Sequence, residues 1–201
     1  MKRDSEYALL LLAGGKSSRM GRDKAELLFE GKTFLQQLLD KANQIGIRKK
    51  YLSGHEGEGK EVQIVKDCYR ERGPLGGLHA GLSASETPFC LVLPVDVPQF
   101  PAELLSLLLD AHGRLSLGEK RKPLLVKHGE RIEPLIGVYP AEMAGFIENE
   151  IREQAAPVFR VLDKWGYGCF QTELPSWQIE NINTPQIYED LLKHQKRGED
   201  R

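Results

Sequence analysis

The segment 9–24, LLLLAGGKSSRMGRDK, concentrates the small and cationic residues that could bind a polyphosphate. Backbone N–H groups of a glycine-rich loop can face an anion, and basic side chains can neutralise its charge. The leucines at 9–12 cannot form one face of an amphipathic element, so they predict a strand covered on both sides in a parallel sheet. The alternative is an ordinary strand-to-helix turn with solvated charges. The polar and basic residues of this loop are Lys16, Ser17, Ser18, Arg19, Arg22 and Lys24.

The glycine spacing of this loop excludes two common nucleotide-binding motifs. A P-loop requires a glycine five residues before Gly15, and position 10 is leucine. A dinucleotide fingerprint requires G-x-G-x-x-G, which Gly14, Gly15 and Gly21 do not satisfy. The loop is therefore of a third kind, L-x-G-G-x-S-x-R-M-G-x-x-K.

Asp96 is a candidate metal ligand in the segment LPVDVP, residues 93–98. It follows the apolar run 89–93 and is the only charged side chain between Glu86 and Glu103. Mg²⁺ usually binds through one or two carboxylates together with substrate phosphates. The alternative role, as the N-cap of a helix that starts near Pro101, would require Asp96 to lie closer to that proline.

The segment 67–82, DCYRERGPLGGLHAGL, is unusually rich in glycine for a helix. Each glycine in a helix costs about 1 kcal/mol relative to alanine. That cost is reasonable where the backbone must touch a ligand, and the alternative is a helix packed tightly on the sheet. Its glycines are Gly73, Gly76, Gly77 and Gly81.

The hydrophobic pattern predicts how these segments are positioned. Strands are expected at 9–12, 49–54, 62–65, 89–93, 124–127 and 134–139, and helices at 33–45, 75–84, 101–112, 142–150, 158–165 and 184–194. The alternation through residue 112 predicts an α/β fold, a Rossmann-like, doubly wound and mostly parallel sheet, with an added antiparallel strand near the C-terminal half. Ligands of such sheets gather at the carboxyl ends of the strands.

Length and composition indicate a single globular domain of 201 residues. We expect residues 196–201 to form a frayed tail. The family resemblance given below implies that residues 1–112 bind nucleotide and metal and that residues 113–195 bind the acceptor substrate. Residues 113–122 match no interpretable pattern. The net charge of −1 provides no general attraction for nucleic acid or an acidic membrane.

The expected location is the cytoplasm. No signal peptide or membrane-length apolar segment is recognisable. Three isolated cysteines, Cys68, Cys90 and Cys169, are expected to be free thiols.

Taken together, several motifs resemble molybdenum cofactor guanylyltransferase. The first of these motifs is the loop within 9–24, and the second is GPLGGLHAGL at 73–82. The others are the D-x-P that follows a buried strand, Glu133-Pro134-Leu135 leading to Tyr139, and the N-x-N-T-P run 181–185. The resemblance extends from Leu9 to about Leu192. Two departures are Val95, where the family often has a polar residue or cysteine, and GPLGG in place of the more frequent GPLAG.

The resemblance implies Mg²⁺-dependent transfer of GMP from GTP to the phosphate of molybdopterin, with release of pyrophosphate. It implies that Lys24, Arg19 and Asp96 are catalytic, with Asp96 on the metal and Lys16 also near the pyrophosphate. Asn181 and Asn183 would face the pterin, and Arg160 is a weaker candidate for that role. Further partners would be cofactor-synthesis proteins or acceptor apo-enzymes. The implied nucleotide-binding residues are Leu12, Ala13, Gly14, Gly15, Lys24, Asp67, Gly76 and Asp96.

Two other functions remain open from the sequence. One is another nucleotidyltransferase of the same fold, of cytidylyl or sugar-phosphate type, and GPLGG with N-x-N-T-P favours the guanylyl enzyme over it. The other is a non-catalytic GTP-binding regulator. Retention of Lys24, Arg19 and Asp96 counts against a regulator, because binding alone does not require the metal carboxylate. Of the histidines, His79 is expected nearest to the site, with a packed or solvated role preferred.

Overall fold

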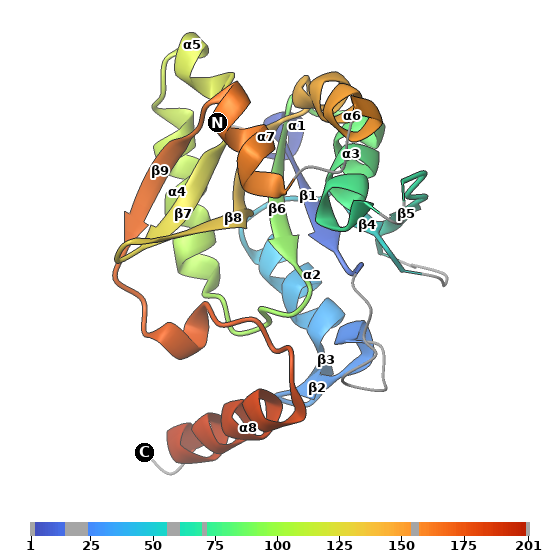
Figure 1. The fold of residues 1–201 in the computed structure, drawn as a ribbon. Helices are drawn as coiled ribbons and strands as arrows, with labels where there is room; N and C mark the ends of the chain where they lie inside the picture. The colour runs from blue at the N-terminus through green and yellow to red at the C-terminus, as the bar shows by residue number, and fades with distance from the viewer. Residues whose placement is uncertain (1–2, 15–23, 56–60, 70–71, 154–156, 200–201) are drawn as a thin grey trace.

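The computed structural model describes residues 3–14, 24–55, 61–69, 72–153 and 157–199, and its centre is a seven-stranded sheet with strand order β5-β4-β1-β6-β8-β7-β9 (Figure 1). Among the described strands of this sheet, only β8 runs antiparallel to its neighbours, which confirms the predicted sheet with one added antiparallel strand. The strands are β1 Tyr7–Leu12, β4 Lys50–Ser53, β5 Gln63–Val65, β6 Phe89–Pro94, β7 Leu124–His128, β8 Arg131–Pro140 and β9 Gly168–Thr172.

Helices cover both faces of the sheet, as the continuous apolar character of β1 predicts. Leu9 and Leu11 contribute to the core cluster that contains α2 and α4, whereas Leu10 and Leu12 contribute to the cluster on the opposite face. Successive strand residues point to opposite faces, so one run of leucines supplies both cores. The first face is covered by α2 Phe34–Gln44 and α4 Ala102–Gly113, and the second by α3 Pro74–Ala84, α6 Met143–Glu153 and α7 Val158–Trp165.

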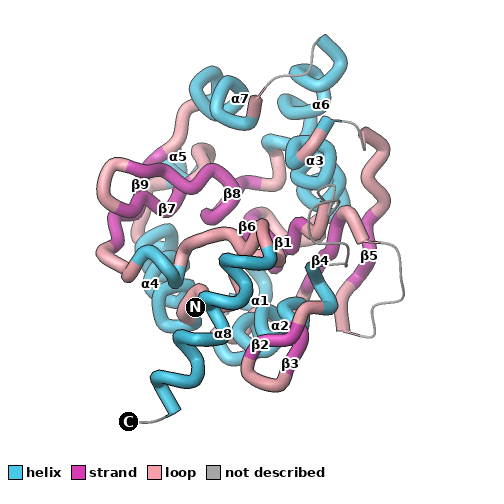
Figure 2. Tube along the Cα trace, turned by 60° about the horizontal axis from the view of Figure 1, so that its bottom comes forward, coloured by secondary structure: helices cyan, strands magenta, loops and turns pink. Residues whose placement is uncertain are grey.

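A third, smaller core joins the C-terminal helix α8 (Pro185–Glu199) to the hairpin of β2 (Leu28–Phe29) and β3 (Lys32–Thr33). The Tyr188 hydroxyl donates a hydrogen bond to the carbonyl oxygen of Leu28, at 2.7 Å. The arrows of β1 and β6 point toward this side of the molecule (Figure 1), and the view in Figure 2 brings it forward. The hairpin and α8 therefore lie at the carboxyl end of the sheet, where a ligand is expected. The apolar side chains of this core are Leu27, Phe29, Phe34, Ile182 and Leu191.

Some elements differ from the sequence-based expectation. Strand β9 was not predicted, because only one of its five residues is buried and its apolar pattern is weak. Residues 113–122 contain the short helix α5 (Leu117–Lys120), which begins at a capping box formed by Ser116 and Glu119. Pro101 is the N-cap of α4 and not a first-turn residue. The described residues also include the short helix α1 Arg3–Glu6 and 3₁₀ turns at Lys24–Glu26 and Ser176–Gln178.

The C-terminal half continues the sheet of the N-terminal half, since β6 pairs with β8 across the predicted division at residue 112. Helix α8 extends past the predicted end at His194 to Glu199, so most of the predicted tail is helical. The three cysteines are free thiols, as predicted. In the described part of the chain, no helix is long and apolar enough to cross a membrane.

Tyr7 and His112 form a buried polar contact between β1 and α4. The Tyr7 hydroxyl and His112 Nδ1 are hydrogen-bonded at 2.9 Å, and the imidazole also packs edge-on against Phe89. Burial, with a smaller effect from Lys120, lowers the pKa of His112 from 6.5 to about 4. The folded protein therefore favours the neutral ring.

We predict that the free energy of unfolding falls as the pH is lowered from 6.5 to about 4, because the unfolded chain takes up the proton first. Below both pKa values the loss from this one group is at most about 3 kcal/mol. His112→Gln keeps a hydrogen-bonding partner for Tyr7 and cannot titrate, so its loss over this range should be smaller. Urea titrations of both proteins at several pH values measure the difference. Identical pH dependence in the two proteins would contradict the assignment.

Candidate functional site

The carboxyl ends of β4, β1 and β6 lie side by side and continue to pair beyond the strands. The backbone N–H of Ala13 donates to the carbonyl oxygen of Ser53, at 2.8 Å. On the other side of β1, the N–H of Val95 donates to the carbonyl oxygen of Leu12, at 3.0 Å. These two bonds place the start of the first loop beside the segment that contains Asp96.

Lys24 is the point at which three predicted site segments meet. Its ammonium group lies 2.8 Å from Asp96 Oδ2 and also donates a short hydrogen bond to Asn183 Oδ1. The backbone N–H of Ile182 donates to the carbonyl oxygen of Asp96, at 2.9 Å. Residues far apart in the sequence therefore form one connected polar site. The side chains of Lys24 and Asp96 retain 18% and 13% exposure, so the site remains open to a ligand.

Asp96 has the chemistry that a hard metal ion requires. One carboxylate oxygen bonds Lys24, whereas Oδ1 is buried and accepts no hydrogen bond from the described residues. A buried anionic oxygen without a donor is destabilising, and a cation would satisfy it. No cluster of three or more His, Cys, Asp or Glu that could hold a metal occurs among the described residues. This arrangement fits Mg²⁺ held by one carboxylate and substrate phosphates.

The first loop starts after Leu12, the last residue of β1, and its first residues lie against the backbone that follows β4. These residues are Ala13 and Gly14. Gly54 has φ +77°, and a Cβ atom there would lie 2.3 Å from the backbone nitrogen of Gly14. Only glycine therefore fits at position 54. The close contact between these two loops fixes where the first loop leaves the sheet.

Asp67 and Gly76 lie in direct contact, as expected if they form one subsite. A Cβ atom on Gly76 would lie 2.6 Å from both carboxylate oxygens of Asp67. Asp67 Oδ1 also accepts the N–H of Tyr69, at 2.7 Å, which orients the carboxylate. Packing explains Gly81 as well, because its Cβ would overlap the Leu10 side chain. Nucleotide contact by Asp67 and Gly76 stays a prediction.

Some predicted site residues lie outside the described part of the chain, namely Gly15, Lys16 and Arg19. Two weaker candidates are described, but neither contacts the Lys24–Asp96 pair. Arg160 lies exposed on α7, and His79 packs edge-on against Tyr69 at 5.3 Å between ring centroids. His79 thus has the packed role that the sequence analysis preferred.

Sequence reasoning missed a cavity of about 470 Å³ beside Asn181, which we call the β8 pocket. Glu133 lines it and is only 5% exposed. Burial raises the pKa of Glu133 above its usual range, although Arg131 and His128 act in the opposite direction. The sequence signal for this pocket is a carboxylate, Glu133, in the otherwise apolar run 132–139. The β8 pocket is lined by Pro94, residues 131–136, Phe159 and Asn181.

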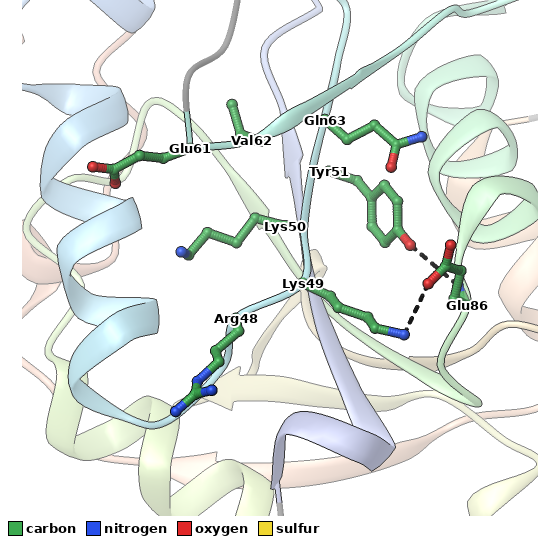
Figure 3. Close-up of a pocket in the computed structure, with 8 residues that line it drawn as sticks. All are labelled: Arg48, Lys49, Lys50, Tyr51, Glu61, Val62, Gln63 and Glu86. Atoms are coloured by element: carbon green, nitrogen blue, oxygen red, sulfur yellow. Dashed lines mark hydrogen bonds and ion pairs between the residues drawn. The ribbon is translucent and has the colours of Figure 1, made fainter.

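A second hollow, of about 360 Å³, lies at the amino ends of β4 and β5 (Figure 3). Lys49 there is ion-paired with Glu86 at 2.9 Å, and the Glu86 N–H donates to the Tyr51 hydroxyl. This hollow is at the opposite end of the strands from Asp96. A nucleotide bound in it could not reach Lys24, so it is not part of the candidate site.

Comparisons with known proteins identify the family of this chain. Residues 9–165 match the family described as MobA-like NTP transferase domain. A probable molybdenum cofactor guanylyltransferase of Clostridium perfringens is 31% identical over 91% of this chain and 94% of its own length. A molybdenum cofactor guanylyltransferase of Pseudomonas aeruginosa is 30% identical over 90% of this chain and 91% of its own.

The fold is also that of a solved structure, molybdopterin-guanine dinucleotide biosynthesis protein A from Archaeoglobus fulgidus. The TM-score is 0.71 at 22% identity, over 96% of this chain and 99% of the other. At that identity the likeness concerns the fold alone. The fold and the site together define a nucleotidyltransferase. More narrowly, the chain belongs to the family of MobA-like NTP transferase domains.

We predict that Gly54→Ala displaces the first loop, because the added methyl group meets the Gly14 backbone and the φ angle is unfavourable. We expect the free energy of unfolding to fall by about 1–3 kcal/mol and the nucleotide affinity to fall by at least about tenfold. Gly46→Ala is the matched control, since Gly46 has φ +82° but no atom within 4 Å of the added carbon. Chemical denaturation and calorimetric titration with nucleotide measure both effects. Equal loss of nucleotide affinity in the control would show that steric contact with Gly14 is not the cause.

Proposed function

We propose that this protein transfers GMP from GTP to the phosphate of molybdopterin, in a Mg²⁺-dependent reaction that releases pyrophosphate. The observation that carries the proposal is the contact of Lys24 with both Asp96 and Asn183. This contact joins the cation that we propose binds phosphate, the carboxylate that we propose binds the metal, and the predicted acceptor segment. The names of the relatives at about 30% identity support guanine as the base and molybdopterin as the acceptor.

The proposed reaction requires little activation of the nucleophile. A phosphate oxygen of the acceptor attacks the α-phosphorus of GTP, a new P–O bond forms, and the bond from the α-phosphorus to the β-bridging oxygen breaks. Pyrophosphate leaves with that electron pair. Catalysis in such a transfer comes mainly from alignment and from stabilisation of charge.

The residues of the chain have distinct roles in this proposal. Lys24 neutralises charge on the phosphates as the leaving group departs, and Arg19 and Lys16 assist from the first loop. Asp96 would hold Mg²⁺, which supplies charge neutralisation and a fixed geometry for the phosphates when bound. The backbone of residues 12–15, with Asp67 and Gly76, would bind the nucleotide base. Asn181 and Asn183 would hold the acceptor, on the side of Asp96 opposite the nucleotide.

The two alternatives have less support. A cytidylyl or sugar-phosphate transferase would share the fold, but the relatives at about 30% identity carry the guanylyl name. A non-catalytic GTP-binding regulator would not need the unsatisfied Asp96 oxygen that the site retains. A cytoplasmic location, and contact with cofactor-synthesis proteins or acceptor apo-enzymes, belong to the same proposal. Pyrophosphate release from each of the four NTPs, with Mg²⁺ and molybdopterin, tests it directly.

Asp96→Asn is expected to fold normally and to lose more than about 90% of kcat, a cost above ~1.4 kcal/mol. The amide keeps the shape of the side chain but removes the negative charge that a divalent cation requires. Asp110→Asn serves as the control, because it removes a carboxylate on α4 that is ion-paired with Arg3. Steady-state kinetics with a Mg²⁺ titration provide the measurement. If Asp96→Asn keeps more than about a tenth of wild-type kcat, Asp96 is not the principal metal ligand.

The double substitution Asn181→Ala and Asn183→Ala is expected to weaken use of molybdopterin and to leave GTP affinity within about threefold of wild type, below ~0.7 kcal/mol. The reason is that the attacking phosphate must approach opposite the leaving pyrophosphate, so the acceptor lies away from the nucleotide. Calorimetric titration with GTP and a molybdopterin-dependent assay separate the two effects. A parallel loss of GTP affinity would place both asparagines in the nucleotide site. Tighter binding of CTP than of GTP would make the protein a cytidylyltransferase.

A further inference from the structure

The β8 pocket exists because β8 is irregular. Leu125 of β7 pairs with Gly137, but the next residue, Val126, pairs with Glu133. Residues 134–136 are therefore additional on β8 and bulge out of the ladder. The Tyr139 hydroxyl donates a hydrogen bond to the Pro134 carbonyl and thereby holds the bulge. Gly137 is required where the ladder resumes, since a Cβ there would lie 2.6 Å from the Leu124 carbonyl oxygen.

The bulge separates β8 from the end of β6. The pairing of these strands stops at Val92 and Gly137, whereas β6 continues to Pro94 and leads directly to Asp96. The β8 pocket occupies the opening, with Pro94 from β6 and Phe159 from α7 among its walls. Because β1 and β4 lie on the other side of β6, the pocket is on the opposite side of Asp96 from the first loop.

Two residues that line the β8 pocket each carry a buried oxygen atom that accepts no hydrogen bond from the described residues. Glu133 Oε1 and Asn181 Oδ1 are buried, and neither accepts a hydrogen bond from the described residues. Arg131 Nε lies 2.7 Å from Glu133 Oε1 as an ion pair, but without the direction of a hydrogen bond. Buried acceptors of this kind are costly in a folded protein unless a ligand supplies donors. The pocket therefore favours a ligand with N–H groups at its edge and apolar faces.

We propose that Glu133 binds the pterin ring of the acceptor, accepting hydrogen bonds from the 2-amino group and N3–H of its pyrimidine edge. Two parallel N–H bonds to one carboxylate are strong and directional. Ile132, Pro94 and Phe159 would cover the faces of the ring, and Asn181 would accept a further donor. This inference rests on the proposed function, because it takes the acceptor to be a pterin.

Guanine presents the same edge, so the base of GTP is the other possible occupant. The position of the pocket favours the pterin. A base in the β8 pocket would lie on the acceptor side of Asp96, away from the Gly14 and Gly76 backbone. The reacting phosphate of the acceptor and the base of the nucleotide would then compete for one space.

The test compares 6-hydroxymethylpterin with 6-hydroxymethyllumazine, which has a carbonyl in place of the 2-amino group. Fluorescence titration gives the Kd of each for the full-length wild-type protein, Glu133→Gln and the control Glu130→Gln, whose side chain is 99% exposed. We expect wild type and control to prefer the pterin by at least about tenfold. Glu133→Gln should abolish or reverse this preference, because its amide can donate to the lumazine carbonyl. Glu133→Asp keeps the carboxylate, so it should retain the preference with weaker binding of both probes.

Three results would overturn the inference. They are an unchanged preference in Glu133→Gln, no pterin binding by wild type at millimolar concentration, and loss of GTP affinity in Glu133→Gln with the preference intact. The last of these would assign Glu133 to guanine. If Glu133→Gln does not fold, Glu133→Asp decides the question. Loss of the pterin preference in folded Glu133→Asp would contradict the inference. The proposed function is judged separately, by pyrophosphate release from wild type with GTP and molybdopterin. If no pyrophosphate is released but the pterin preference still depends on Glu133, the protein binds pterin and catalyses a different reaction.

Discussion

The contact between Lys24 and Asp96 is the interaction on which the organisation of the site depends. A carboxylate that is 13% exposed would be costly without a partner, and the Lys24 ammonium supplies one. The same ammonium also reaches Asn183, so the two charges are held together with the C-terminal segment. Because the bridge is partly open to solvent, the metal ion and phosphates of the proposed reaction would be able to reach these side chains. The ion pair thus stabilises the ligand-free site, and both side chains remain accessible to a ligand.

The position of this pair follows from strand order. Strand β6 lies between β1 on one side and β8 on the other, and Asp96 follows its carboxyl end. Parallel pairing with β1 brings the first loop to one side of Asp96. Antiparallel pairing with β8 ends early and leaves an open pocket on the other side. In the proposed transfer, Asp96 would therefore face the nucleotide on one side and the acceptor on the other.

The C-terminal helix contributes to function through packing. Helix α8 and the β2–β3 hairpin share a small core that includes Phe34 and Leu191. The hairpin follows Lys24, and α8 follows Asn183, so this core fixes the two side chains relative to each other. The Ile182 N–H bond to the Asp96 carbonyl adds a backbone connection to the sheet. Tertiary packing of elements far apart in the sequence thus holds the polar groups that meet in the site.

The sequence by itself determined the class of fold and most of the residues that meet at the site. The uninterrupted leucines of β1 and the apolar run of β6 indicate strands buried in a two-sided parallel sheet, so their carboxyl ends were expected at the same edge of that sheet. Lys24, Asp96 and Asn183 could be chosen because their charges and amide follow recognisable motifs. Local pattern also located the main helices, since a 3.6-residue period depends on neighbours in the chain.

Only the tertiary structure decided the contacts that depend on pairing between distant segments. The register shift between β7 and β8 cannot be read from either strand alone, so the β8 pocket and the burial of Glu133 were hidden. Strand β9 has little apolar character and forms because the exposed edge of β7 offers it backbone partners. Gly54 has its role because another loop happens to lie against it. In each case the deciding energy comes from a neighbour that is remote in sequence, and only the folded chain brings the two together.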